Sequence, residues 1–182
     1  MAKKHSFTGK TVSHCQLELP PLNLNKVKIR FDQYEYLMPY EVIPTDFETF
    51  EHVFVKGFAD SSKRQQWFKN YVTYNNELKT LIGTGFIQWV DGSFVSQKFN
   101  PNDIDLLTFI DFERYELHEK GIEHLRKQRY QRKTGIDGYF VKTYPVGHKL
   151  HQIYVIECKR WLFDFTTDSF TKRSKGIIQL NF

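Results

Sequence analysis

The sequence predicts an α+β fold in which helices flank a small mixed β-sheet. Helical and extended patterns alternate from about residue 61, in the order helix, strand, strand, helix, strand, helix, strand. Aromatic residues make up 16% of the 182 residues, which supplies enough apolar material for one well-packed core. Since no repeat or long linker divides the chain, we expect a single domain over residues 26–182, preceded by a loosely ordered polar arm at residues 1–25.

The N-terminal part of the domain contains one short predicted helix. The segments KVKIRF (26–31) and YEYLMPYEV (34–42) fit either short strands or extended coil. The segment TDFE (45–48) has the form of a capping box, in which side chains satisfy the first free N–H groups of a helix. We therefore expect a helix that opens at this segment and ends near Gly57.

The rest of the chain supplies the sheet and its main helices. A long helix is expected from Ser61 or Ser62 to Gly83 or Gly85, because apolar residues recur at helical spacing and glycine commonly ends helices. The other predicted elements are strand 86–90, strand 103–112, a helix from 113 to about 129 that Gly121 weakens, strand 138–145, which Pro145 stops, a helix from about 150 to 165, and strand 175–180.

The composition excludes several classes of protein. The two cysteines are too few for a disulfide framework and form no CxxC pair, which indicates a reducing compartment and no catalytic thiol. The N-terminus lacks the apolar run of a signal peptide, and no 18 apolar residues run together, so we expect a cytoplasmic protein without a membrane partner. The seven histidines have no zinc-ligand spacing, and no P-loop motif is present. The net charge of +5 favours anionic partners such as nucleotides.

The candidate site lies in the segment FIQWVDGSFVSQKFNPNDIDLLTF (86–109). Gly92 and Ser93 follow the first strand, where glycine lets the backbone approach a ligand and a serine hydroxyl can hold phosphate oxygens. Ten residues after Ser93, Asp103 and Asp105 open the second strand. Residues two apart on a strand point to the same face, so these carboxylates lie side by side. At ~5 Å and an effective dielectric of about 20 they repel by about 3 kcal/mol.

A divalent cation would offset this repulsion. Mg²⁺ takes one or two carboxylates and fills its other positions with water and substrate phosphate. The sequence NPND is also a good turn, so Asp103 alone would be interpreted as a turn former. Asp105 inside an apolar run, with Gly-Ser upstream, instead favours a metal site that takes Mg²⁺, or Mn²⁺ in its place.

The arrangement of Gly92, Ser93, Asp103 and Asp105 resembles the nucleotidyltransferase core of the DNA polymerase β superfamily. The likeness is greater to a group of small uncharacterised bacterial proteins assigned to that superfamily, and it covers residues 61–180. This resemblance implies a two-metal transfer of an NMP from an NTP to an acceptor, with release of pyrophosphate. Asp103 and Asp105 would bind both Mg²⁺ ions, and Ser93 with the adjoining backbone would hold the triphosphate.

The resemblance also implies a third acid on a neighbouring strand. Asp137 opens the strand after the following helix, which is where the family pattern places that acid. Asp111 shares a face with Asp105 but lies about 20 Å further along its strand, and Glu157 qualifies only if its segment is a strand. Among the basic residues near the site, Lys175 is the best candidate for a phosphate contact, because it immediately precedes the last strand.

Two other functions remain open. The chain could keep this fold as a catalytically weak or inactive binding module, for example in a toxin–antitoxin or phage-defence pair. The basic run from Lys120 to Lys133 could instead bind nucleic acid, although a solvated helix face is the simpler interpretation. The transferase hypothesis leaves the acceptor as a partner protein, an RNA end or a small molecule, and the short chain favours the first or the last over long nucleic acid.

Overall fold

A computed structural model describes residues 28–130 and 132–182, so the arm predicted for residues 1–25 lies outside the described part of the chain. The main sheet has five strands in the order β3-β7-β4-β5-β6. Its strands are β3 (Val42–Pro44), β4 (Ile87–Asp91), β5 (Ile104–Asp111), β6 (Ile136–Thr143) and β7 (Ile177–Asn181). The pairs β3–β7 and β5–β6 are parallel, while β4 is antiparallel to both of its neighbours. The predicted α+β class with a small mixed sheet is therefore confirmed.

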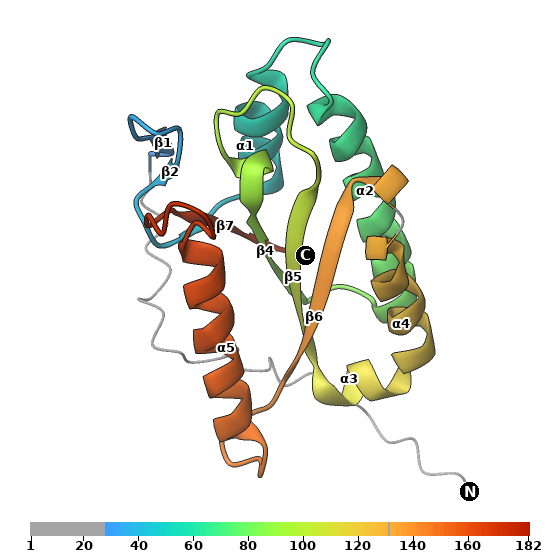
Figure 1. Cartoon of the computed structure of the whole chain (residues 1–182). Helices are drawn as coiled ribbons and strands as arrows, with labels where there is room; N and C mark the ends of the chain where they lie inside the picture. The colour runs from blue at the N-terminus through green and yellow to red at the C-terminus, as the bar shows by residue number, and fades with distance from the viewer. Residues whose placement is uncertain (1–27, 131) are drawn as a thin grey trace, which may run out of the picture.

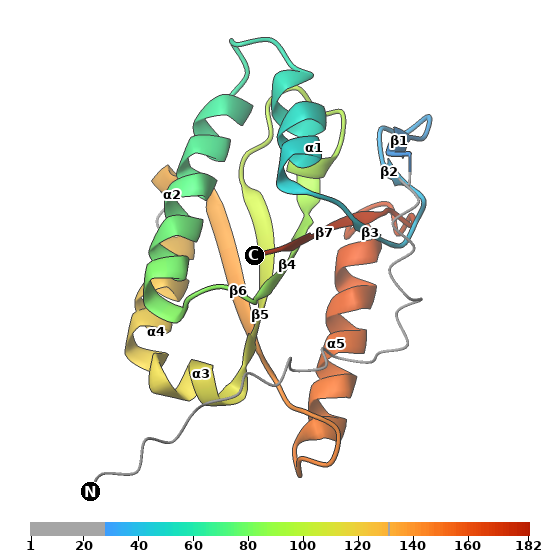
Figure 2. The same ribbon diagram turned by 180° about the vertical axis from the view of Figure 1, so that it is seen from behind.

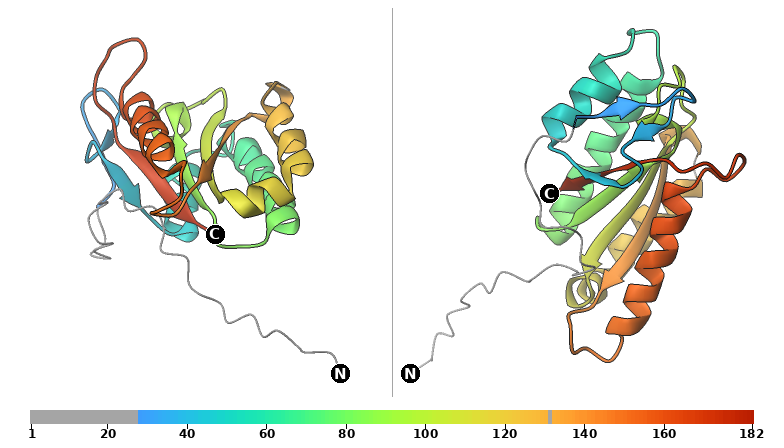
Figure 3. Two further views of the ribbon diagram at one scale, coloured as in Figure 1. Left: turned by 90° about the horizontal axis from the view of Figure 1, so that it is seen from below. Right: turned by 90° about the vertical axis from the view of Figure 1, so that its left-hand side faces the viewer.

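Helices cover both faces of this sheet (Figure 3). On one face lie α1 (Phe47–Glu51), α2 (Arg64–Ile82) and α4 (Glu119–Lys127), as the view from behind shows (Figure 2). Val90 and Leu106 of the sheet belong to the core on this side. On the other face lies α5 (His151–Thr166), whose Tyr154, Cys158 and Phe165 pack with Trp89, Leu107 and Val141. Alternate residues of β4 and β5 thus serve two separate cores, which explains why successive residues of these strands can be apolar.

The predicted elements from residue 61 onward are present in the predicted order. The helix expected over 113–129 is divided, however, into α3 (Phe112–Leu117), α4 and a 3₁₀ turn η3 (Gln128–Tyr130). The break falls at His118, whose φ of −113° and ψ of 18° are not helical. Gly121 does not break the helix but lets α4 approach α2, since a Cβ atom there would lie 2.6 Å from Cδ1 of Leu81.

The N-terminal segments adopt both of the forms that the sequence left open. β1 (Arg30–Phe31) and β2 (Leu37–Met38) form a separate antiparallel pair, and the following residues supply the edge strand β3. The helix cap lies at Asp46, one residue later than the capping-box pattern indicates. The Asp46 carboxylate accepts hydrogen bonds from the backbone N–H and the hydroxyl of Thr49. α1 then continues as a π-helical segment, His52–Lys56, up to Gly57. None of the helices in residues 28–182 is long and apolar enough to cross a membrane.

Candidate functional site

Three aspartates form a row across three neighbouring strands. Asp91 on β4 is paired directly with Asp105 on β5, and Asp105 is paired with Asp137 on β6. Residues paired in this way point to the same face of a sheet. Asp103 directly precedes β5, and its spacing of two residues from Asp105 predicts the same face. The row therefore lies on the face that α5 covers, near the end of the sheet where β5 and β6 begin (Figure 1).

Gly92 and Asp105 are in direct contact, as the sequence predicts for the two parts of the motif. Gly92 has a φ of +79°, and a Cβ atom at this position would overlap the Asp105 carboxylate. Glycine is required here both for the backbone conformation and for the space. Ser93 follows in the short 3₁₀ helix η2 (Gly92–Val95). The predicted phosphate-binding segment therefore starts beside the carboxylate of Asp105.

Burial, together with nearby carboxylates, raises the pKa of Asp105 and of Asp103. Burial raises the pKa of Asp105 to about 7, and the charges of Asp91, Asp103 and Asp137 add to this effect, while Lys175 opposes it. The pKa of Asp103 is also raised, first by burial and then by Asp137. Such a cluster favours either a bound proton or a bound cation over free carboxylates.

Each end of the row carries a basic partner. At one end, Nζ of Lys175 lies 2.7 Å from Oδ2 of Asp91. At the other, Nε of Arg129 lies 3.0 Å from Oδ1 of Asp137, and the hydroxyl of Tyr139 donates to Oδ2 of the same carboxylate at 3.2 Å. Lys175, predicted to contact phosphate, is thus engaged by a carboxylate, and Asp137, predicted as the third metal ligand, already has two partners.

The residues fit a divalent cation in charge and chemistry. Four carboxylates face one region with two cationic partners, and Oδ1 of Asp91 is buried without a hydrogen-bond partner in the described residues. Hard oxygen donors of this kind are those that Mg²⁺ prefers. Over residues 28–130 and 132–182, no group of three or more His, Cys, Asp or Glu side chains is arranged as a ready-made metal-binding group. The fit therefore rests on the charge and identity of the donors.

Arg64 fixes the loop that carries Ser93. Its fully buried guanidinium donates hydrogen bonds to the backbone carbonyls of five residues, with donor–acceptor distances of 2.5 to 3.3 Å. Burial lowers the pKa of Arg64 to about 10, so it remains charged at neutral pH. The accepting residues are Phe54, Ser93, Phe94, Ser96 and Lys98.

Sequence reasoning missed two residues of this arrangement. Asp91 directly precedes the Gly-Ser pair, but only the register between β4 and β5 places it opposite Asp105. Arg64 lies 29 residues before Ser93 and carries no motif. The one available signal was the position of Asp91 at the end of an apolar strand, where a carboxylate is as unexpected as Asp105 is in the next strand.

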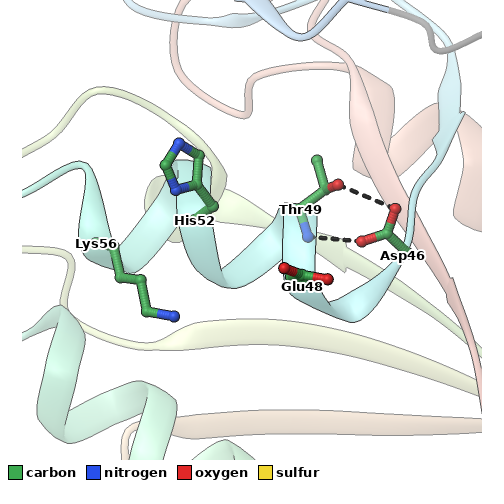
Figure 4. A pocket seen from close by; sticks show the side chains of 5 residues that line it. All are labelled: Asp46, Glu48, Thr49, His52 and Lys56. Atoms are coloured by element: carbon green, nitrogen blue, oxygen red, sulfur yellow. Dashed lines mark hydrogen bonds between the residues drawn. The ribbon is translucent and has the colours of Figure 1, made fainter.

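A separate polar hollow lies on α1 and its π-helical extension (Figure 4). Asp46, Glu48, Thr49, His52 and Lys56 line it. The Asp46 carboxylate caps the helix, and Lys56 forms an ion pair with Glu51 at 2.9 Å. This hollow is on the opposite face of the sheet from the aspartate row, so it forms no part of the candidate site.

The comparison with protein families gives one match. A model described as a family of unknown function, DUF6932, matches residues 29–181. No curated protein and no solved structure matches the chain. The family match spans every strand of the main sheet, the three aspartates of the row and Asp103. The chain therefore belongs to the DUF6932 family.

Proposed function

We propose that the protein is a metal-dependent nucleotidyltransferase that moves an NMP from an NTP to a protein, RNA or small-molecule acceptor. The observation that carries this proposal is the contact between Gly92 and Asp105, with a carboxylate on each neighbouring strand facing the same side. This is the pairing of a phosphate-binding turn with a cation-binding acid that such chemistry needs. The resemblance in sequence to polymerase β-like enzymes supports the same conclusion.

In this proposal Asp103 and Asp105 hold Mg²⁺, or Mn²⁺ in its place, with Asp137 as the third acid implied by the resemblance. The bound metal would neutralise charge on the α-phosphate and lower the pKa of the acceptor hydroxyl. Ser93 and the backbone of η2 would contact the triphosphate, in a loop whose position Arg64 fixes. The acceptor oxygen forms a bond to the α-phosphorus as the bond to the β-phosphate oxygen breaks and pyrophosphate leaves. Orientation and charge neutralisation would provide most of the rate enhancement.

Two assays test the proposal. Purified protein with Mg²⁺ and each α-labelled NTP should release pyrophosphate and leave label on an acceptor, supplied as a cell extract freed of nucleotides. Asp103→Ala and Asp105→Ala should each abolish the transfer. A matched control is Asp111→Asn, at the far end of the same strand, which should retain it. Absence of transfer from every NTP, or transfer that persists in both alanine variants, would refute the proposal.

One observation favours a second candidate, a nucleotide-binding module without chemistry. Asp137 already contacts Arg129 and Tyr139, and the positive charge of Arg129 makes it a weaker metal ligand than an unpaired carboxylate would be. Calorimetry separates the candidates, because a binding module takes up NTP and Mg²⁺ in a simple isotherm with no continuing heat of turnover. A transferase supplied with its acceptor gives continuing heat and pyrophosphate.

A further inference from the structure

We propose that Asp91 is a positioning residue whose charge strengthens the hold of Asp105 on a divalent cation, with Lys175 as its fixed counter-ion. This inference rests on the proposed function, because it concerns the same cation site. It adds a carboxylate from the strand on the other side of β5 from Asp137, the acid that the resemblance implies.

Asp91 is placed to act on Asp105. It is directly opposite Asp105 in the antiparallel pair of β4 and β5, where facing side chains lie ~5 Å apart. Asp91 is only 6% exposed, so its charge is weakly screened by water.

Lys175 partly neutralises the buried carboxylate of Asp91. Its ammonium group contacts Oδ2 of Asp91 from the residue two before β7, the strand on the other side of β4. The lysine side chain is 14% exposed, so the pair is largely withdrawn from solvent. Asp91 faces Asp105 directly, whereas Lys175 precedes β7, which β4 separates from β5. Asp91 is therefore the nearer partner of Asp105 in the sheet, and Lys175 reaches the row from beyond it.

A purely structural role explains the pair less well. Buried ion pairs contribute little net stability, because desolvation of both charges offsets their attraction. A like charge directly opposite on the next strand is destabilising, and Oδ1 of Asp91 has no hydrogen-bond partner among the described residues. A neutral pair would join β4 to β7 at lower cost. The arrangement is explained if the excess negative charge serves cation binding.

The test measures Mn²⁺ affinity on the full-length protein, by electron paramagnetic resonance of free Mn²⁺ or by calorimetry, without nucleotide. We expect Asp91→Asn to weaken Mn²⁺ binding at least tenfold, in line with the effect of outer groups on metal ligands. Asp91→Glu, which keeps the charge, should restore most of the affinity. Asp111→Asn is the matched control, since Asp111 is on the same strand as Asp105 but caps α3 at its far end.

A second variant covers the case in which Asp91→Asn does not fold. The double variant Asp91→Asn with Lys175→Met removes both buried charges, so neither is left uncompensated. Its Mn²⁺ affinity should still fall, because Asp91 faces Asp105 directly while Lys175 enters from the far side of β4.

The outcomes separate this inference from the proposed function. If the wild-type protein binds no Mn²⁺, or if Asp105→Asn binds it as well as wild type does, the cation site itself is refuted. If wild type binds Mn²⁺ through Asp105 and the folded Asp91 variants bind it equally well, the present inference is overturned and the proposed function stands.

Discussion

Replacing Asp105 with asparagine should stabilise the metal-free protein, and more so at higher pH. Burial and the neighbouring carboxylates raise the pKa of Asp105 from 3.8 to about 7. A carboxyl whose pKa is raised by folding keeps its proton better in the folded state, so the free energy of unfolding falls as the pH rises between these two values. Asparagine has a similar shape but cannot ionise. The variant therefore escapes this loss, which is complete above about pH 7.

The size of the effect follows from the two pKa values. A difference of about three pH units corresponds to a ceiling of about 4 kcal/mol. Asp105 is partly exposed, and water screens its charge, so we expect about 1–2 kcal/mol at pH 8 and close to zero at pH 4. For a chain of this size that is an increase in Tm of about 3–6 °C.

Thermal or urea unfolding in EDTA, at pH 5 and pH 8, measures the difference. The stabilisation should be larger at pH 8, and saturating Mg²⁺ should shrink it, because the cation stabilises wild type and not the variant. A variant that is less stable than wild type at pH 8, or a difference that does not change with pH, would contradict the interpretation of Asp105 as a buried acid without a basic partner.

Three further substitutions test the framework of the site. Gly92→Ala should lower the free energy of unfolding in urea by at least about 2 kcal/mol, since alanine is strained at a positive φ. It should also weaken Mn²⁺ binding, because its Cβ displaces the Asp105 carboxylate; unchanged binding would exclude the contact between Gly92 and Asp105. Arg64→Met should lower the free energy of unfolding by more than about 3 kcal/mol, because several buried carbonyls lose a charged hydrogen-bond donor. Arg64→Lys should recover only part of this stability, and full recovery would show that the charge alone matters. Gly121→Ala should fail to give the gain of about 1 kcal/mol that alanine normally brings to a helix, because its Cβ crowds Leu81. A double-mutant cycle with Leu81→Ala should restore that gain, with a coupling of about 1 kcal/mol; zero coupling would show that the helices do not touch here.

The order of elements could be predicted because each depends on short-range patterns. The helical spacing of apolar residues identifies α2, and the apolar runs identify β4 and β5, whose residues serve cores on both faces. The division of the helix at His118 could not be predicted from the sequence, because nothing in the chemistry of histidine prevents it from continuing a helix. Gly121 misled for a similar reason: its lack of a side chain serves the packing on Leu81, which is visible only once α2 and α4 are placed together.

The candidate site divides in the same way. The side-by-side carboxylates of Asp103 and Asp105 follow from the period of a strand, and the contact with Gly92 follows from the Gly-Ser turn. The ion pair of Lys175 with Asp91 joins residues that are distant in sequence. The ion pair of Asp137 with Arg129 depends on how η3 lies beside β6. Such pairings are set by register, which the local sequence does not specify.

The distribution of charge along the row is the strongest argument for a bound cation. A sheet that merely tolerated aspartates would pair each with a basic side chain or separate them. Here the partners are at the two ends, with Lys175 on Asp91 and Arg129 on Asp137. The centre, where Asp105 lies between both and packs against Gly92, has no such ion pair among the described residues. With a pKa of about 7, Asp105 is only about half protonated at neutral pH, so part of its charge remains unneutralised there. In the proposed function a divalent cation would neutralise that charge and would keep coordination positions for phosphate.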